Sequence, residues 1–159
     1  MKLISSIWLI LLSFGLCNAQ FAVLNPESIT SKGTPLTFTI NDFDGDGRKD
    51  IAYLTDRPIT LTVIFSESNN SFTEIVPYTT SGNSFATTKA ISSGDINKDG
   101  KADIIFFDNA ISSSNKIIAL TSKGRSFEQI IIQTPSSASA SGCISLLDWD
   151  GDSNLDLMV

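Results

Sequence analysis

Residues 42–51 read DFDGDGRKDI, residues 95–104 read DINKDGKADI and residues 148–157 read DWDGDSNLDL. The three segments share one pattern, with Asp or Asn at positions 1, 3, 5 and 9 and an apolar residue at positions 2 and 10. Each segment begins 53 residues after the one before it. Repetition at a fixed spacing of this size is typical of proteins that use one structural unit several times.

The sequence around these segments predicts β-strands. Short runs rich in β-branched and aromatic residues alternate with turn-forming Ser, Asn, Gly and Pro, and no long amphipathic helical period occurs beyond the N-terminal region. The predicted strands are residues 36–40, 51–54, 59–65, 72–76, 104–107, 116–120 and 127–132. Each 53-residue period therefore holds about four short strands, which is the pattern of a β-propeller blade.

Residues 1–19 are predicted to be a cleaved secretory signal peptide. Lys2 gives a positive start, an apolar run ends at Leu16, and Ala19 offers a small residue for cleavage. The run is shorter than the roughly 20 residues that a membrane-spanning helix needs. We therefore expect a secreted or extracellular protein, with the cell surface included, whose mature part is residues 20–159 and has no membrane span.

Composition excludes several kinds of chemistry. The chain has no His, which rules out a Ser-His-Asp or Cys-His nucleophile and a histidine-bound zinc ion. The net charge is −6, whereas binding to nucleic acid requires a basic surface, so no nucleic-acid partner is expected. Cys143 is the one cysteine of residues 20–159, so no internal disulfide is expected there. Its place directly before Ile144 favours a buried side chain.

The acidic segments have the ligand spacing of a calcium site. They hold eleven of the seventeen acidic residues, and carboxylates this close repel one another unless a cation compensates them. Oxygens at positions 1, 3, 5 and 9, with a backbone carbonyl at position 7, can surround one Ca²⁺. The predicted ligands are Asp42, Asp44, Asp46, Asp50 and the carbonyl of Arg48; Asp95, Asn97, Asp99, Asp103 and the carbonyl of Lys101; and Asp148, Asp150, Asp152, Asp156 and the carbonyl of Asn154.

Two further positions bear on these sites. Gly47 and Gly100 at position 6 supply a sharp turn, whereas Ser153 replaces this glycine and leaves metal binding by the third segment open. The apolar side chains at position 2 are expected to anchor each loop to the core; they are Phe43, Ile96 and Trp149. Asp and Gly are also common in turns that bind nothing, but three segments in register favour a metal. A helix-loop-helix calcium site is excluded, because position 12 is not Glu in any of the three.

The repeated pattern Asp-x-Asp-x-Asp-Gly-x-x-Asp-Ile resembles the FG-GAP and VCBS repeats of integrin α-subunit-like propellers, over nearly all of residues 20–159. The resemblance implies calcium in loops between the strands of a blade, where it stiffens the scaffold away from the ligand-binding face. We predict an all-β fold: a partial β-propeller of about 2.6 four-stranded blades with calcium-binding loops, after the cleaved signal peptide. Because closure needs more repeats, further blades are expected in a longer chain or in a partner.

The predicted function is a secreted calcium-binding β-propeller repeat module that acts as a binding or adhesion scaffold, with structural Ca²⁺ and an extracellular protein or glycan as ligand. We predict no enzyme activity for this chain. The alternative is a scaffold fragment of a secreted carbohydrate-active enzyme, a lyase or hydrolase. Paired carboxylates can hydrolyse glycosides, but almost every Asp here stands at ion-ligand spacing. A third possibility is a purely structural repeat of a large surface protein.

Overall fold

The structure is a computed structural model that describes residues 33–56, 58–80, 90–108, 116–133 and 143–159. The predicted signal peptide and the predicted cleavage position lie outside the described residues. Within these five ranges, no helix has the length and apolar character that crossing a membrane requires.

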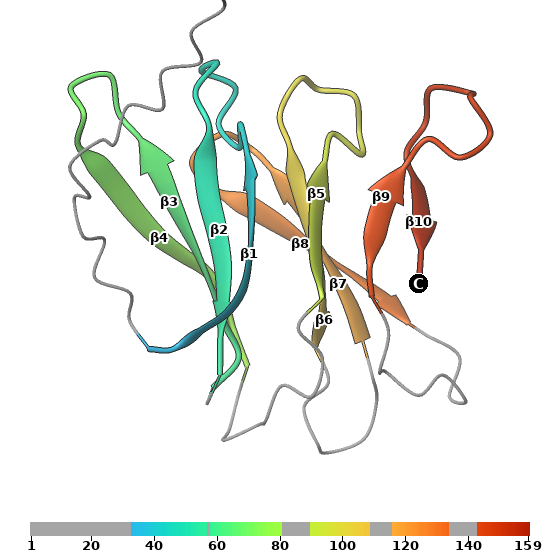
Figure 1. Ribbon diagram of the computed structural model, residues 1–159, viewed down its shortest axis with the longest axis horizontal. Helices are drawn as coiled ribbons and strands as arrows, with labels where there is room; N and C mark the ends of the chain where they lie inside the picture. The colour runs from blue at the N-terminus through green and yellow to red at the C-terminus, as the bar shows by residue number, and fades with distance from the viewer. Residues whose placement is uncertain (1–32, 57, 81–89, 109–115, 134–142) are drawn as a thin grey trace, which may run out of the picture. The chain divides into compact units, whose positions relative to one another are not determined.

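The described residues form ten β-strands in three antiparallel sheets (Figure 1). They are β1 (Pro35–Asn41), β2 (Asp50–Thr55), β3 (Thr60–Ser66), β4 (Phe72–Thr79), β5 (Ile91–Gly94), β6 (Asp103–Asp108), β7 (Lys116–Ser122), β8 (Phe127–Gln133), β9 (Ser145–Leu147) and β10 (Asp156–Met158). The first sheet has the order β1-β2-β3-β4, the second β5-β6-β7-β8, and the third pairs β9 with β10. The prediction of an all-β fold with four strands per repeat is confirmed.

All seven predicted strands are present, with ends that differ from the prediction by at most three residues. The predicted strands did not include β5, β9 and β10, which are only 4, 3 and 3 residues long. β5 and β9 are rich in Ser, Gly and Leu rather than β-branched residues. The repeat itself carried the signal, because β5 and β9 stand directly before the second and third acidic segments, as β1 does before the first. Closure of these sheets into a propeller stays a prediction.

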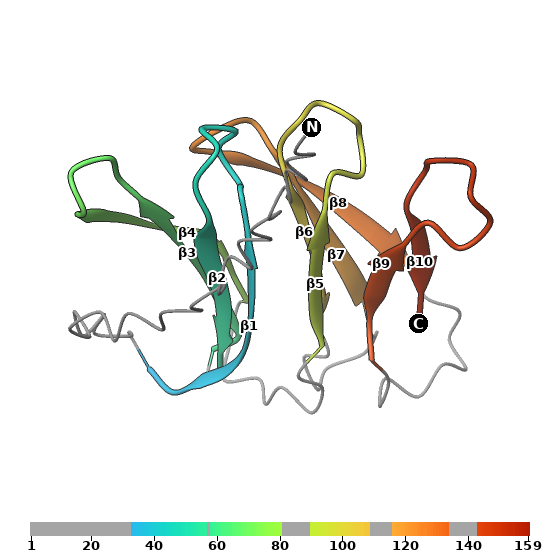
Figure 2. The same ribbon diagram turned by 45° about the horizontal axis from the view of Figure 1, so that its top comes forward.

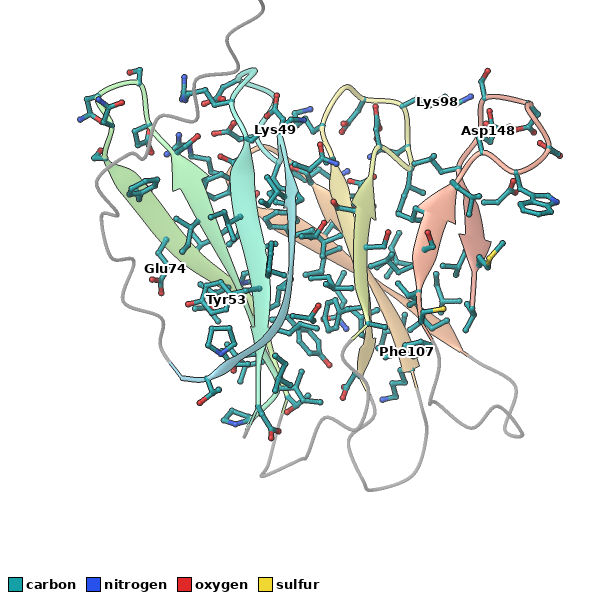
Figure 3. All side chains as sticks on the ribbon, in the orientation of Figure 1. Lys49, Tyr53, Glu74, Lys98, Phe107 and Asp148 are labelled. Atoms are coloured by element: carbon teal, nitrogen blue, oxygen red, sulfur yellow. The ribbon has the colours of Figure 1, made fainter. Side chains whose placement is uncertain are left out.

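Two apolar cores lie between the sheets. The first joins side chains of the first and second sheets, among them Leu54, Val63, Ile104 and Phe106. The second lies between the second and third sheets and includes Phe107 (Figure 3). Successive residues of a strand point to opposite faces, so β6 sends alternate side chains into the two cores. Burial of each such side chain stabilises the fold by about 1.5–3 kcal/mol, which explains why both faces of the middle sheet are apolar.

The prediction that Cys143 is buried is wrong. Its side chain is exposed, whereas the neighbouring Ile144 is buried in the second core. Neighbouring residues on an extended chain point to opposite sides, so only one of the two can face the core. Ile144 has the larger apolar side chain and takes that place.

Candidate metal-binding loops

Each acidic segment connects the first two strands of its sheet. We call residues 42–50 the first loop, residues 95–103 the second loop and residues 148–156 the third loop. They join β1 to β2, β5 to β6 and β9 to β10, respectively. Figures 1 and 2 show that the three loops leave the same end of their sheets.

The backbone follows the same path in all three loops. Position 4 has a positive φ in each, at Gly45 (81°), Lys98 (60°) and Gly151 (78°). Position 6 does so as well, at Gly47 (87°), Gly100 (85°) and Ser153 (68°). A left-handed conformation strains a residue with a side chain by roughly 1–2 kcal/mol, so Ser153 carries a cost that the two glycines avoid. The missing glycine therefore adds strain to the third loop without changing its path.

The first carboxylate of each loop closes the turn on itself. Its Oδ2 accepts a hydrogen bond from the backbone N–H at position 6, which is 2.8 Å away in the first loop, 2.9 Å in the second and 3.0 Å in the third. These pairs are Asp42 with Gly47, Asp95 with Gly100 and Asp148 with Ser153. Position 5 accepts the N–H of position 7 in the same way in each loop. The motif thus fixes the loop conformation through its own backbone.

The carboxylate at position 9 ties the loop to its sheet. In the first loop, Asp50 is buried and accepts the N–H of Phe43 (3.0 Å) and of Ser66 at the end of β3 (2.9 Å). In the second loop, Asp103 is buried and accepts the equivalent N–H groups of Ile96 (2.9 Å) and Ser122 (2.7 Å). Burial raises the pKa of both carboxyls, and the backbone N–H groups oppose this shift. In the third loop, the exposed Asp156 accepts the N–H of Trp149 (2.9 Å).

The sequence reading did not assign a role to Ser66 or Ser122. Both end the third strand of their sheet, and this shared place in the repeat was the available signal. Ser122 has a second contact, since its hydroxyl donates a 2.5 Å hydrogen bond to the carbonyl of Phe43 in the first loop. It therefore links the two sheets as well as bracing its own loop.

Carboxylates converge most closely in the first and third loops. In each, one oxygen from every member of a group of three lies within 4.8 Å of the others; the groups are Asp42, Asp44 and Asp50, and Asp148, Asp150 and Asp152. Ligands on opposite sides of a Ca²⁺ ion stand about 4.6–5.2 Å apart, so this spacing fits such an ion. Asp46 and Asp156 are not members of these groups. Among the described residues, the second loop has no three-carboxylate group, and its position 3 is the amide Asn97.

Basic side chains compensate the first two loops. Arg48 pairs with Asp46, and Nη2 of Arg125 lies 3.1 Å from Oδ2 of Asp44. In the second loop, Nζ of Lys101 lies 3.4 Å from Oδ2 of Asp99. The backbone N–H and the charge of Lys101 lower the pKa of Asp99.

The third loop is compensated less directly. In the part of the chain that the structure describes, its carboxylates form no ion pair. Lys98 extends toward this loop (Figure 3), and its charge adds to the hydrogen bonds from Asn154 that lower the pKa of Asp152.

The first loop is also bonded directly to the second sheet. The carbonyl of Asp42 accepts the N–H of Ala102 at 2.8 Å, and the carbonyl of Phe43 accepts the Ser122 hydroxyl. The carboxylate of Asp44 pairs with Arg125, which lies between β7 and β8. Three consecutive residues of the first loop therefore contact the second sheet or its turns.

The expected anchoring by position 2 holds only for Phe43. It is fully buried in the first core, where residues of the second sheet cover it. Ile96 is 36% exposed and Trp149 is 72% exposed, so the prediction is wrong for these two residues. Phe43 packs in the core that the first and second sheets share, and neither Ile96 nor Trp149 belongs to a core cluster of the described residues. No sheet follows Trp149 in the described ranges.

Repeated antiparallel sheets, each with an acidic turn after its first strand, define a class of β-repeat proteins. Within that class, the model of the FG-GAP-like repeat matches residues 21–106, which is more than half of the chain. The chain belongs to the FG-GAP-like repeat family. The matched region contains the first two loops, and the third repeats their pattern beyond it. None of the curated proteins compared with this sequence matches it.

Proposed function

We propose that this chain is a secreted, calcium-stabilised module of a β-propeller that serves as a scaffold for binding or adhesion to an extracellular protein or glycan. Residues 1–19 would be its signal peptide and residues 20–159 its propeller repeats. Family membership supports the coarser statement, a β-propeller-like binding scaffold. The observation that carries the calcium proposal is the convergence of three carboxylates within 4.8 Å in two loops that share positive φ at positions 4 and 6.

The donor set fits calcium better than a softer metal. The ligands proposed for each loop are carboxylate, amide and carbonyl oxygens, which suit hard cations, and they include no sulfur or imidazole. A bound Ca²⁺ would neutralise the clustered charge. The chain's own residues supply the preformed site, because backbone N–H groups already hold the position 1 and position 9 carboxylates toward the loop.

Exposed apolar residues support the proposal of further blades. On the first sheet, Phe38 is 64% exposed and Ile40 52% exposed, while Trp149 and Val159 are exposed beside the third sheet. The middle sheet has both faces covered by neighbouring sheets, so these residues are suited to similar cover. That cover would come from a longer chain or from a partner.

Calcium removal tests the proposal. Extracellular calcium sites often have Kd values of about 10⁻⁴ to 10⁻³ M. A site with a Kd of about 10⁻⁴ M adds roughly 1.4 kcal/mol in millimolar Ca²⁺, and three such sites add about 4 kcal/mol. Thermal melting should therefore shift to lower temperature in a chelator, and Asp46→Ala or Asp99→Ala should reproduce part of that shift. Glu128→Ala, at an exposed acid outside the loops, is the matched control. An unchanged melt, together with no heat in a calorimetric titration, contradicts the proposal.

The binding role has its own measurement. Binding to glycan and protein arrays, with and without chelator, should show a ligand whose capture weakens when calcium is removed. We propose that the module acts without catalysis. Turnover of a polysaccharide by the purified chain would contradict this and favour a fragment of a carbohydrate-active enzyme instead.

A further inference from the structure

Arg125 joins the second sheet to the first loop. Its Nη1 lies 2.5 Å from Oε1 of Glu67 and its Nη2 lies 3.0 Å from Oε2, so the guanidinium forms a bidentate ion pair with that carboxylate. The same Nη2 lies 3.1 Å from Oδ2 of Asp44, and the guanidinium carbon lies 5.2 Å from the ring centre of Phe65. Asp44, Glu67 and Phe65 all belong to the first sheet or its turns. Three groups thus fix one orientation of this side chain through four contacts, which suits the planar fork of Arg.

The two oxygens of Asp44 face different partners. Oδ2 meets Arg125, whereas Oδ1 accepts the N–H of Asp46 at 3.3 Å, inside the first loop. The Asp44 side chain is only 7% exposed and belongs to the carboxylate group with Asp42 and Asp50. Arg125 therefore holds one oxygen of Asp44, while the other oxygen is hydrogen-bonded within the loop, and the carboxylate as a whole belongs to the converging group.

The charge of Arg125 is balanced locally. The hydrogen bond from Arg125, together with one from Thr73, lowers the pKa of Glu67 to about 2, so Glu67 is ionised near neutral pH. The Arg125–Glu67 pair is then neutral as a unit. It orients Asp44 without adding a net positive charge beside the loop, and orientation of a metal ligand by an outer partner commonly changes metal affinity.

We propose that Arg125 is a positioning residue of the first loop, and that its contact with Asp44 raises the calcium affinity of that loop and couples it to the second sheet. The inference rests on the proposed function, namely that the first loop binds Ca²⁺. Loss of an orienting partner costs about 10–100-fold in metal affinity. In the described residues, no guanidinium holds a carboxylate of the third loop, so that loop is an internal reference.

The test is a calcium titration of the full chain followed by the backbone amide signals of Gly47 and Ser153. These amides donate to the position 1 carboxylates of the first and third loops, so each reports one loop. Arg125→Gln is expected to weaken the calcium affinity reported by the Gly47 amide about 10-fold and to leave the affinity reported by the Ser153 amide unchanged. Lys123→Gln is the matched control. It removes one positive charge near the same turn, but Lys123 pairs with Glu128 and not with Asp44. This variant should leave the calcium affinity at both amides unchanged.

A second variant keeps the test decisive if Arg125→Gln does not fold. Glu67→Gln keeps the guanidinium but weakens its fixed orientation, so it should weaken binding at Gly47 by a smaller factor. Equal or tighter binding at Gly47 in the folded variants overturns the inference, and so does an equal effect of Lys123→Gln. If Gly47 of the unaltered chain does not respond to Ca²⁺, the proposed function of this loop fails and the inference fails with it. A normal response that no variant alters overturns the inference alone.

Discussion

The first and third loops share a motif, a backbone path and internal hydrogen bonds, but their surroundings differ. In the first loop, Asp44 is nearly buried, contacts Arg125 and lies within a segment bonded to the second sheet. In the third loop, Asp148, Asp150 and Asp152 are all exposed. The motif therefore determines the conformation of the loop, whereas the neighbouring sheet determines how well its charge is compensated.

This difference has an energetic consequence. In the first loop, Asp44 and Asp46 already have guanidinium partners. In the third loop, the carboxylates repel one another without an ion pair to any described residue, and Lys98 acts from a distance. The third loop should thus gain more order from a bound cation than the first. Three tests sharpen or break this comparison.

The largest effect is expected from the position 9 carboxylates. Asp50→Ala leaves two N–H groups without their charged acceptor, and hydrogen bonds to a charged group contribute about 1.5–3 kcal/mol each. After allowance for the burial of the carboxylate, we expect a loss of about 3 kcal/mol in the free energy of unfolding. Asp156→Ala removes one exposed hydrogen bond and should cost less than about 1 kcal/mol.

Urea unfolding in chelator measures both variants without a contribution from calcium. Equal losses would show that burial and the contact with the third strand do not distinguish the two loops. The neighbouring sheet would then contribute nothing that separates the first loop from the third.

A smaller effect is expected from exchanging the residues at position 6. Ser153→Gly relieves the left-handed strain and should stabilise the chain by about 1 kcal/mol. Gly47→Ser should destabilise it by roughly 1–2 kcal/mol, because φ is 87° there. No steric clash adds to this cost, since no atom lies within 4 Å of the added Cβ. Thermal melting of both variants would reveal opposite shifts, and shifts of the same sign would refute the equivalence of the two turns.

The smallest effect concerns pH and the Arg125–Glu67 pair beside the first loop, which has no counterpart at the third loop among the described residues. The folded state lowers the pKa of Glu67 from 4.5 to about 2, chiefly through the hydrogen bond from Arg125. Its ionised form therefore stabilises the fold fully above pH 4.5, and this contribution is lost as the pH falls toward 2. The stability difference between the unaltered chain and Glu67→Gln in chelator should be larger at pH 6 than at pH 3. Glu128→Gln serves as the exposed control, and a difference that grows at pH 3 would contradict the assignment.

The strands and the loop path followed from local patterns. A 53-residue period, alternating apolar runs and Asp-Gly turns sufficed to predict the four-strand repeat, because these signals depend on neighbours in sequence. The contacts of Arg125 with Glu67 could not be predicted, since the two residues are 58 positions apart and meet only after the sheets pack. Trp149 shows the same limit, because an apolar residue is buried only where another sheet covers it.

The apolar character of both faces of the middle sheet also bears on strand alignment. In β6 and β7, residues on either face are buried and apolar, so a shift of one position would still bury hydrophobic side chains on both sides. Burial alone cannot select the correct pairing of these strands. The bond from the Ser122 amide to Asp103 can, because it forms in only one alignment. The same aspartate that we propose as a metal ligand thus also distinguishes the correct strand pairing from a shifted one.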